Sequence, residues 1–104
     1  MELKVDRIYL TAQGSPENNS DPKNSSTDVI VFLENGKKYI ASFFAYANIN
    51  EIRRKHKKNG NFLNGAYFWD KNMVLVEDCS LKMIEPVVKD IIDEGNFREA
   101  FREL

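Results

Sequence analysis

The sequence has 104 residues, of which 42% are hydrophobic, 12% aromatic and 30% charged. This balance excludes a disordered chain and is typical of one globular domain spanning residues 1–104. The formal net charge of −1 argues against a dedicated nucleic-acid-binding protein, and no apolar run approaches the ~20 residues that cross a bilayer. Residues 1–7 also lack the apolar segment of a signal peptide, so we expect a cytoplasmic protein with no membrane contact.

The first predicted element is a strand over residues 3–11. Its apolar residues form two alternating pairs of opposite phase, Leu3 with Val5 and Ile8 with Leu10. One extra residue in a strand reverses the face to which later side chains point. The change of phase at Asp6-Arg7 therefore predicts a β-bulge or a short edge strand.

Residues 12–27 form a polar segment rich in Asn, Ser and Pro, with no residue suited to anchor it in a core. A connection of this length without secondary structure is uncommon in a compact domain. We therefore expect a mobile polar loop at residues 12–27.

A β-hairpin is the strongest local pattern. Residues 29–33 (Val-Ile-Val-Phe-Leu) are apolar at every position, which predicts a central strand covered on both faces. Asn35-Gly36 is typical of a tight turn with positive φ angles, and residues 39–46 then return as the partner strand.

A basic helix follows the hairpin. Asn48 is placed to cap it, with Glu51 three residues later as in a capping box, and Gly60 is a natural stop. The helix has a narrow apolar stripe, and the stretch 51–58 is dominated by Arg and Lys. We expect most of its surface to face solvent.

Two short strands are predicted next, at residues 67–69 and 73–76. Ser80 or Asp78 then opens a helix with apolar residues at helical spacing. Pro86 either occupies the first turn of a helix that starts near Glu85 or interrupts a longer one. Gly95 ends this helix, and a last amphipathic turn or two extends to Leu104.

The predicted order is β-β-β-α-β-β-α-α. Hairpins dominate this order and no β-α-β alternation repeats, so it favours an α+β fold. We expect one antiparallel sheet of about four to five strands, with helices packed on one face.

Residues with reactive side chains are isolated in the sequence. His56 is the only histidine and has five cationic neighbours, while Cys79 is the only cysteine and follows two carboxylates that disfavour its thiolate. A single cysteine excludes a Cys-rich zinc site, and no Asp-x-Asp-x-Asp calcium loop is present. We therefore predict a non-enzymatic protein with no catalytic residue, no metal site and no cofactor.

Charge is distributed unevenly along the chain. Residues 51–76 hold six basic and two acidic side chains, a local charge of +4, whereas residues 77–104 hold four basic and eight acidic ones, a local charge of −4. The basic run is followed by several aromatic residues. The predicted partner-binding residues are Arg53, Arg54, Lys57, Lys58, Phe62, Tyr67 and Trp69.

Three interpretations of this cationic and aromatic segment stay open. The cations could face an acidic protein partner. They could grip a single nucleic-acid strand through phosphate contacts while the aromatic rings stack on bases. They could also be an ordinary solvated face above aromatic residues of the core. A protein partner is favoured over nucleic acid because of the overall charge.

From Asp28 onward the chain resembles small bacterial immunity proteins that neutralise a cognate toxin, including those of contact-dependent inhibition systems. The resemblance is carried by the closing helix and by three runs: Ser42-Phe-Phe-Ala-Tyr-Ala-Asn-Ile49, Gly65-Ala-Tyr-Phe-Trp69 and Met73-Val-Leu-Val-Glu77. It implies a cytosolic, non-enzymatic protein that binds one partner tightly, and it assigns no site residue.

We therefore predict a protein-binding module, most concretely an immunity protein that binds a toxin domain. The alternative is a small nucleic-acid-binding regulator that uses the basic helix 51–58. A third hypothesis is an enzyme or a small-ligand carrier with a pocket between the sheet and the C-terminal helix, lined by Tyr46, Tyr67 and Trp69, although the residue types argue against catalysis. None of these patterns determines the oligomeric state.

Overall fold

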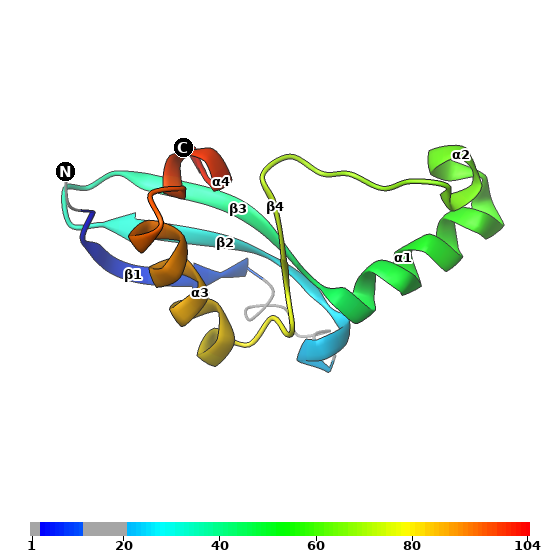
Figure 1. The fold of residues 1–104 in the computed structure, drawn as a ribbon, viewed down its shortest axis with the longest axis horizontal. Helices are drawn as coiled ribbons and strands as arrows, with labels where there is room; N and C mark the ends of the chain where they lie inside the picture. Colours follow the sequence, from blue (N-terminus) through cyan, green and yellow to red (C-terminus); the bar gives the residue numbers. More distant parts are fainter. Residues whose placement is uncertain (1–2, 12–20) are drawn as a thin grey trace.

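The computed structural model describes residues 3–11 and 21–104, which form an α+β fold with a helical arm (Figure 1). The strands are β1 (Val5–Leu10), β2 (Ser26–Leu33), β3 (Lys38–Ala45), β4 (Met73–Val76) and β5 (Arg102–Glu103). The helices are the 3-10 helix η2 (Pro22–Asn24) and the helices α1 (Tyr46–Asn59), α2 (Asn61–Gly65), α3 (Leu81–Asp93) and α4 (Phe97–Ala100). The predicted α+β class is confirmed.

All strands in the described residues belong to one sheet. The order is β1-β2-β3-β4, and β5 also pairs with β3. The β1–β2, β2–β3 and β3–β5 pairs are antiparallel, as expected, and the short β3–β4 pair is parallel because the arm intervenes between these strands. The element order roughly follows the prediction: residues 67–69 form no strand, and η2, α2 and β5 are additional elements.

The β-bulge predicted in the first strand is confirmed. In the β1–β2 pair, Val5 lies opposite Leu33 and Arg7 lies opposite Phe32, so Asp6 is the extra residue. The bulge places the apolar residues on both sides of it on the same face of the sheet. Val5 and Ile8 are therefore both half-buried, whereas Asp6 and Arg7 are exposed. In the described residues β1 is an edge strand of the sheet.

The predicted hairpin is formed by β2 and β3. The backbone N–H of Gly36 donates to the carbonyl of Leu33 over 3.0 Å, and the N–H of Leu33 donates to the carbonyl of Lys37 over 2.9 Å. Of the two turn residues Asn35 and Gly36, only Gly36 has a positive φ angle, of 89°. The prediction of a positive φ at Asn35 was wrong; its side chain instead accepts a hydrogen bond from the N–H of Lys37.

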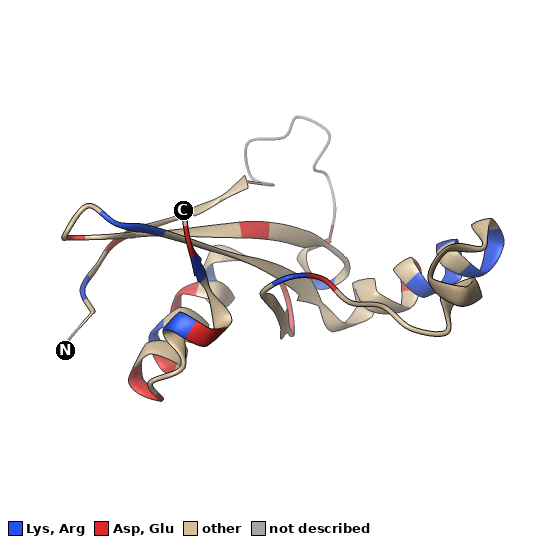
Figure 2. Cartoon of the chain, turned by 90° about the horizontal axis from the view of Figure 1, so that it is seen from above, with Lys and Arg blue, Asp and Glu red and all other residues tan. Residues whose placement is uncertain are grey.

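The two faces of β2 differ. Val29, Val31 and Leu33 are buried, whereas Ile30 and Phe32 are only half-buried. The prediction of a strand covered on both faces was therefore wrong for the described residues: α3 and α4 lie on one face of the sheet (Figure 2). On the other face the guanidinium of Arg7 covers the Phe32 ring, with its central carbon 4.2 Å from the ring centre.

The core lies between the sheet and the helices α3 and α4. Helix α3 contributes Ile84 and Val88, and both are almost fully buried. The Phe97 ring stacks on Phe101 with centroids 4.7 Å apart, and Phe101 also packs near Phe43. The amphipathic C-terminal turns expected from the sequence thus close the core, and β5 holds them against the sheet by pairing with β3.

The predicted loop at 12–27 extended too far. Pro22–Asn24 forms the 3-10 helix η2, capped by the Asp21 side chain, and β2 begins at Ser26. Thr27 is buried, which the polar composition did not indicate. Residues 12–20 lie outside the described part of the chain.

Helix α3 begins one residue after Ser80, as the sequence suggested. The Ser80 hydroxyl accepts a hydrogen bond from the N–H of Met83 over 3.2 Å. Pro86 lies inside this longer helix on its exposed side, where water can solvate the carbonyl that loses its partner. No helix in residues 3–11 and 21–104 combines the length and apolar character needed to traverse a bilayer.

Candidate functional site

A helical arm, residues 46–72, projects from the end of the sheet (Figure 1). It comprises α1, α2 and the segment that returns to β4. The arm makes the molecule elongated, with extents of 46 × 28 × 21 Å and a radius of gyration of 14.6 Å, compared with about 13 Å for a compact domain of this length. No residue of α1 is buried. A 14-residue helix without a buried side chain lacks the packing that usually stabilises helices.

The arm begins where β3 turns directly into α1. Ala45 occupies the N-cap position and makes no side-chain cap hydrogen bond. The prediction that Asn48 caps this helix was wrong, because Asn48 lies inside the first turn and its Oδ1 atom is buried without a hydrogen-bond partner among the described residues. The stop at Gly60 is confirmed: Gly60 has a φ of 83° and donates its N–H to the carbonyl of His56.

The tip of the arm has an unusual backbone. Phe62, Leu63 and Asn64 have φ angles of 54°, 52° and 58°, so α2 is a left-handed turn. Each non-glycine residue in this conformation costs roughly 1–2 kcal/mol. Gly65 closes the turn with a φ of 80° and is the one buried residue of α2. Its Cα faces the backbone of Arg53, so the turn packs tightly against α1.

A chain of aromatic contacts connects the tip of the arm to the sheet. The His56 ring stacks on Phe62 with centroids 4.5 Å apart and planes inclined by 13°. Phe62 contacts Tyr67 and Phe68, and Phe68 packs edge-on against Phe44 of β3 at 5.4 Å. The prediction of a strand at residues 67–69 was wrong: Tyr67 and Phe68 make these ring contacts, and the segment belongs to no strand. His56 is a packing residue of this cluster.

The cations of α1 remain on the surface. Six of the eight charged residues of the arm are basic, whereas residues 77–104, which include α3, hold eight acidic and four basic side chains (Figure 2). Arg54 forms an ion pair of 2.8 Å with Glu51, and both side chains are largely solvent-accessible. No ion pair within residues 3–11 and 21–104 involves the other cations of the helix, which are Arg53, Lys55, Lys57 and Lys58.

Large apolar side chains are exposed on the same arm. Their relative exposures are Tyr46 52%, Leu63 75%, Tyr67 52% and Trp69 64%. Large aromatic side chains dominate the energetics of protein interfaces as well as cores. The arm therefore presents aromatic surface and positive charge together.

All seven predicted partner-binding residues lie on the arm. Tyr67, Trp69 and the four cations are exposed, whereas Phe62 is half-buried under His56 and supports the surface from within. The sequence did not single out Leu63 as a surface residue. Its position between two potential turn residues, Asn61 and Asn64-Gly65, is the signal that points to an exposed tip.

Cys79 is a structural residue. It is buried, and its thiol donates to the carbonyl of Ser25 over 3.3 Å. Burial is the main cause that raises the pKa of the Cys79 thiol above its usual value of 9.0. Nowhere in the described residues do three or more His, Cys, Asp or Glu side chains group so that they could hold a metal ion.

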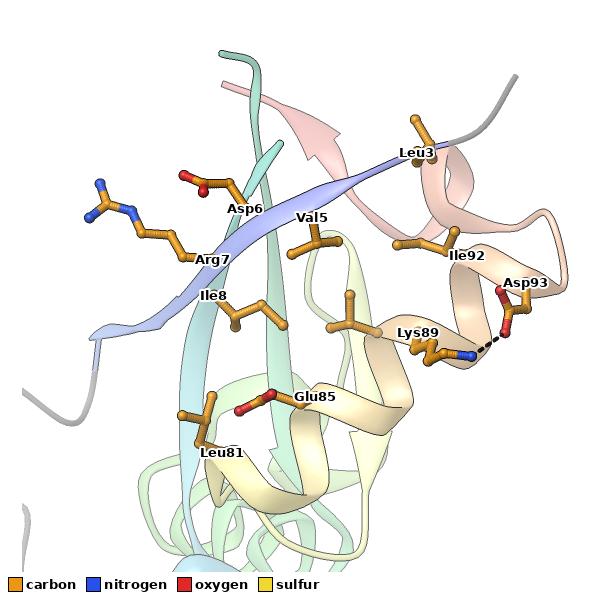
Figure 3. A pocket seen from close by; sticks show the side chains of 11 residues that line it. Leu3, Val5, Asp6, Arg7, Ile8, Leu81, Glu85, Lys89, Ile92 and Asp93 are labelled. Carbon is orange, nitrogen blue, oxygen red and sulfur yellow. Dashed lines mark hydrogen bonds and ion pairs between the residues drawn. The ribbon is translucent and has the colours of Figure 1, made fainter. Parts of the chain in front are cut away.

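One cavity lies away from the arm, and a second lies beside the sheet where Asp70 of the arm reaches it. The first, of about 600 Å³, lies between β1 and α3, and its lining is mostly apolar (Figure 3). The other, of about 290 Å³, is small and polar and includes Asp28 and Ser42. The expected pocket between the sheet and the C-terminal helix thus has a counterpart in the first cavity. However, Tyr46, Tyr67 and Trp69, which were expected to line such a pocket, line neither.

Comparison of the chain with protein-family models, with curated proteins and with solved structures gave no match.

Proposed function

We propose that this chain is a non-enzymatic protein-binding module whose arm docks on an acidic surface of a partner protein. In its most concrete form, it is an immunity protein that neutralises a cognate bacterial toxin. The main support for this proposal is that no residue of α1 is buried and that four large apolar side chains of the arm are exposed.

Exposed aromatic residues suit an interface. Binding hot spots are enriched in Trp, Tyr and Arg, and truncating such a residue often costs 2 kcal/mol or more of binding free energy. Trp69 and Tyr67 are more than half exposed and so retain most of the surface that a partner could cover. Leu63 extends the same apolar surface at the tip of the arm.

The charges of the arm favour an acidic partner. Cations such as Lys55 and Lys58 have no ion pair in the described residues and would steer an acidic surface toward the arm. Complementary charge mainly raises the association rate and the specificity of a complex. We expect the association rate to fall as ionic strength rises.

The resemblance to immunity proteins supports the concrete form of the proposal. Two of the three resembling runs, residues 42–49 and 65–69, fall on the arm and its junction with β3, and the third, residues 73–77, contains β4. Two of the resembling runs therefore contribute to the proposed binding surface, whereas the closing helix, which shares the resemblance, lies outside the arm.

Growth rescue tests this function. The chain is co-expressed with the toxin encoded beside its gene, and the complex of the purified proteins is measured by calorimetry. We expect full rescue by the natural chain and none by Trp69→Ala combined with Lys58→Glu. The matched control is Lys82→Glu, which makes the same charge change on the exposed side of α3. Absence of both rescue and complex formation would refute the proposal.

Nucleic acid is the alternative partner, favoured by the exposed Tyr67 and Trp69 rings beside a cationic helix. Binding of labelled single-stranded RNA and DNA is measured at increasing salt. Counterion release predicts a slope of log affinity against log salt of about −0.7 for each phosphate contacted. If the natural chain shows such a slope and the Lys55→Glu variant shows a shallower one, nucleic acid is the partner of the arm in place of a protein.

A further inference from the structure

A groove separates β1 from α3, in a part of the molecule remote from the arm (Figures 1 and 3). Its volume is about 600 Å³. Six apolar residues line it: Leu3, Val5, Ile8, Leu81, Val88 and Ile92. Five of these are only partly buried, so the groove is an apolar surface that the described part of the chain leaves incompletely covered.

The strand beside the groove has one unpaired edge. β1 pairs with β2, and no strand in residues 3–11 and 21–104 pairs with its other side. Such an edge presents backbone N–H and C=O groups to any chain that lies alongside. The bulge at Asp6 directs both Val5 and Ile8 toward α3, while Asp6 and Arg7 point away from it (Figure 3).

We propose that this groove binds an extended peptide with alternating apolar and basic side chains, which adds to the sheet beside β1. Strand addition of this kind obtains affinity from main-chain hydrogen bonds and specificity from pockets for alternate side chains. An added strand would extend the sheet over the outer side of α3. Its inward apolar side chains would then cover Leu81 and Ile92, the partly buried residues of that helix.

The charge around the groove selects a basic peptide. The charged residues that line the groove are Asp6, Glu85 and Asp93 on the acidic side and Arg7 and Lys89 on the basic side. Asp93 is paired with Lys89 at 3.1 Å, and the Arg7 guanidinium lies over the Phe32 ring. The exposed carboxylates of Asp6 and Glu85 have no ion pair among the described residues. The segment that contains α3, residues 77–104, carries a charge of −4. Two copies joined through β1 would bring two such acidic segments together, so charge complementarity favours a basic peptide over a second copy.

Binding is tested on the full chain by fluorescence anisotropy, with a short labelled peptide that alternates lysine and valine. One control peptide has the same composition with its valines in one block, and a second has glutamate in place of lysine. We expect each control to bind at least about tenfold more weakly. Equal binding of all three peptides would overturn the proposal, because the proposed site requires a peptide in which apolar side chains alternate with positively charged ones.

Two protein variants locate the site. Glu85→Lys reverses the charge at the groove and should weaken binding of the lysine–valine peptide about tenfold. Glu51→Lys makes the same change on α1 and should leave its affinity within about twofold. Amide chemical shifts that change on α1 in place of β1 and α3 would overturn the assignment of the site.

Sedimentation velocity of the chain alone tests the competing occupant. We expect a monomer. A dimer in which the outer edge of β1 is protected from hydrogen exchange would show that the groove binds a second copy of the chain and not a peptide. None of these measurements involves the arm's partner, so failure of this proposal and failure of the protein-binding function are separable.

Discussion

Gly65 lies against the backbone of Arg53 so closely that a Cβ atom on Gly65 would be 2.8 Å from the Arg53 carbonyl oxygen. The same Cβ would lie 3.1 Å from Cγ of Lys57. The left-handed turn of α2 is thereby fixed against α1, although α1 itself has no buried residue. Within the arm, α2 is held on α1 by this contact and by the stack of His56 on Phe62, and Phe68 connects the arm to Phe44 of β3.

We therefore predict that Gly65→Ala destabilises the arm. The substitution adds both a strained φ of 80° and a clash with backbone, so α1 and α2 amides should exchange at least about tenfold faster in hydrogen-exchange measurements. Gly36→Ala is the matched control: its φ is 89°, but no atom lies within 4 Å of the added Cβ. Equal exchange of the α1 and α2 amides in the two variants would contradict a role for the contact.

Phe97 of α4 and Phe101, which follows the helix at its C-cap, carry a large share of the stability. Phe101 is almost fully buried between Phe97 and Phe43, so Phe101→Ala should lower the free energy of unfolding by about 3–5 kcal/mol. Leu63→Ala removes a side chain that is 75% exposed and should change it by less than about 0.5 kcal/mol. Urea denaturation of both variants measures the difference. Similar losses would show that the tip of the arm packs in solution.

The cap of α3 gives stability a dependence on pH. Hydrogen bonds from the hydroxyl and the N–H of Ser80 lower the pKa of Asp78 below its usual value of 3.8. A lowered folded-state pKa contributes stability that is present above pH 3.8 and is lost as the pH falls through the folded-state pKa.

Ser80→Ala should cost about 1 kcal/mol at neutral pH, because it removes the N-cap hydrogen bond to the N–H of Met83. The difference from the natural chain should shrink below pH 3.8, where Asp78 no longer gains from its bond to the hydroxyl. Thermal unfolding of both proteins across this pH range measures it. A difference that is constant with pH would show that Asp78 is not coupled to Ser80.

Cys79 should react slowly in the folded protein. Burial raises the pKa of its thiol above 9.0, so at pH 8 both the thiolate fraction and access are lower than in the unfolded chain. Alkylation by iodoacetamide should be at least about tenfold slower in the native state than in denaturant, with glutathione as the reference thiol. The neutral thiol's contribution to stability is complete below pH 9.0 and is lost as the pH rises through the folded-state pKa.

Several parts of the fold were predictable because their determinants are local. The two alternating phases of residues 3–10 indicated the bulge, Asn35-Gly36 indicated the hairpin, and Ser80 indicated the start of α3. In each case a few neighbouring residues favour one backbone geometry, and the structure adopts that geometry at the same residues. The seven predicted partner-binding residues also share one surface element because they are close in sequence.

Other features depend on contacts between distant residues. Whether Phe62 and Trp69 are buried or exposed depends on how α2 folds back on α1, and that depends on the contact of Gly65 with Arg53. The segment 67–69 has strand-like composition, but Phe68 packs against Phe44 and Tyr67 packs against Phe62, while Trp69 is exposed.

The sequence by itself determined a single α+β sheet with a basic helix, because hydrophobic periodicity and turn residues act over a few positions. Only the tertiary structure decided that this helix leaves the sheet as an arm and that β1 and α3 enclose an apolar groove. The arm arises because β3 turns directly into α1, and the groove arises because α3 packs beside the edge strand β1; no local pattern specifies which surfaces then remain uncovered.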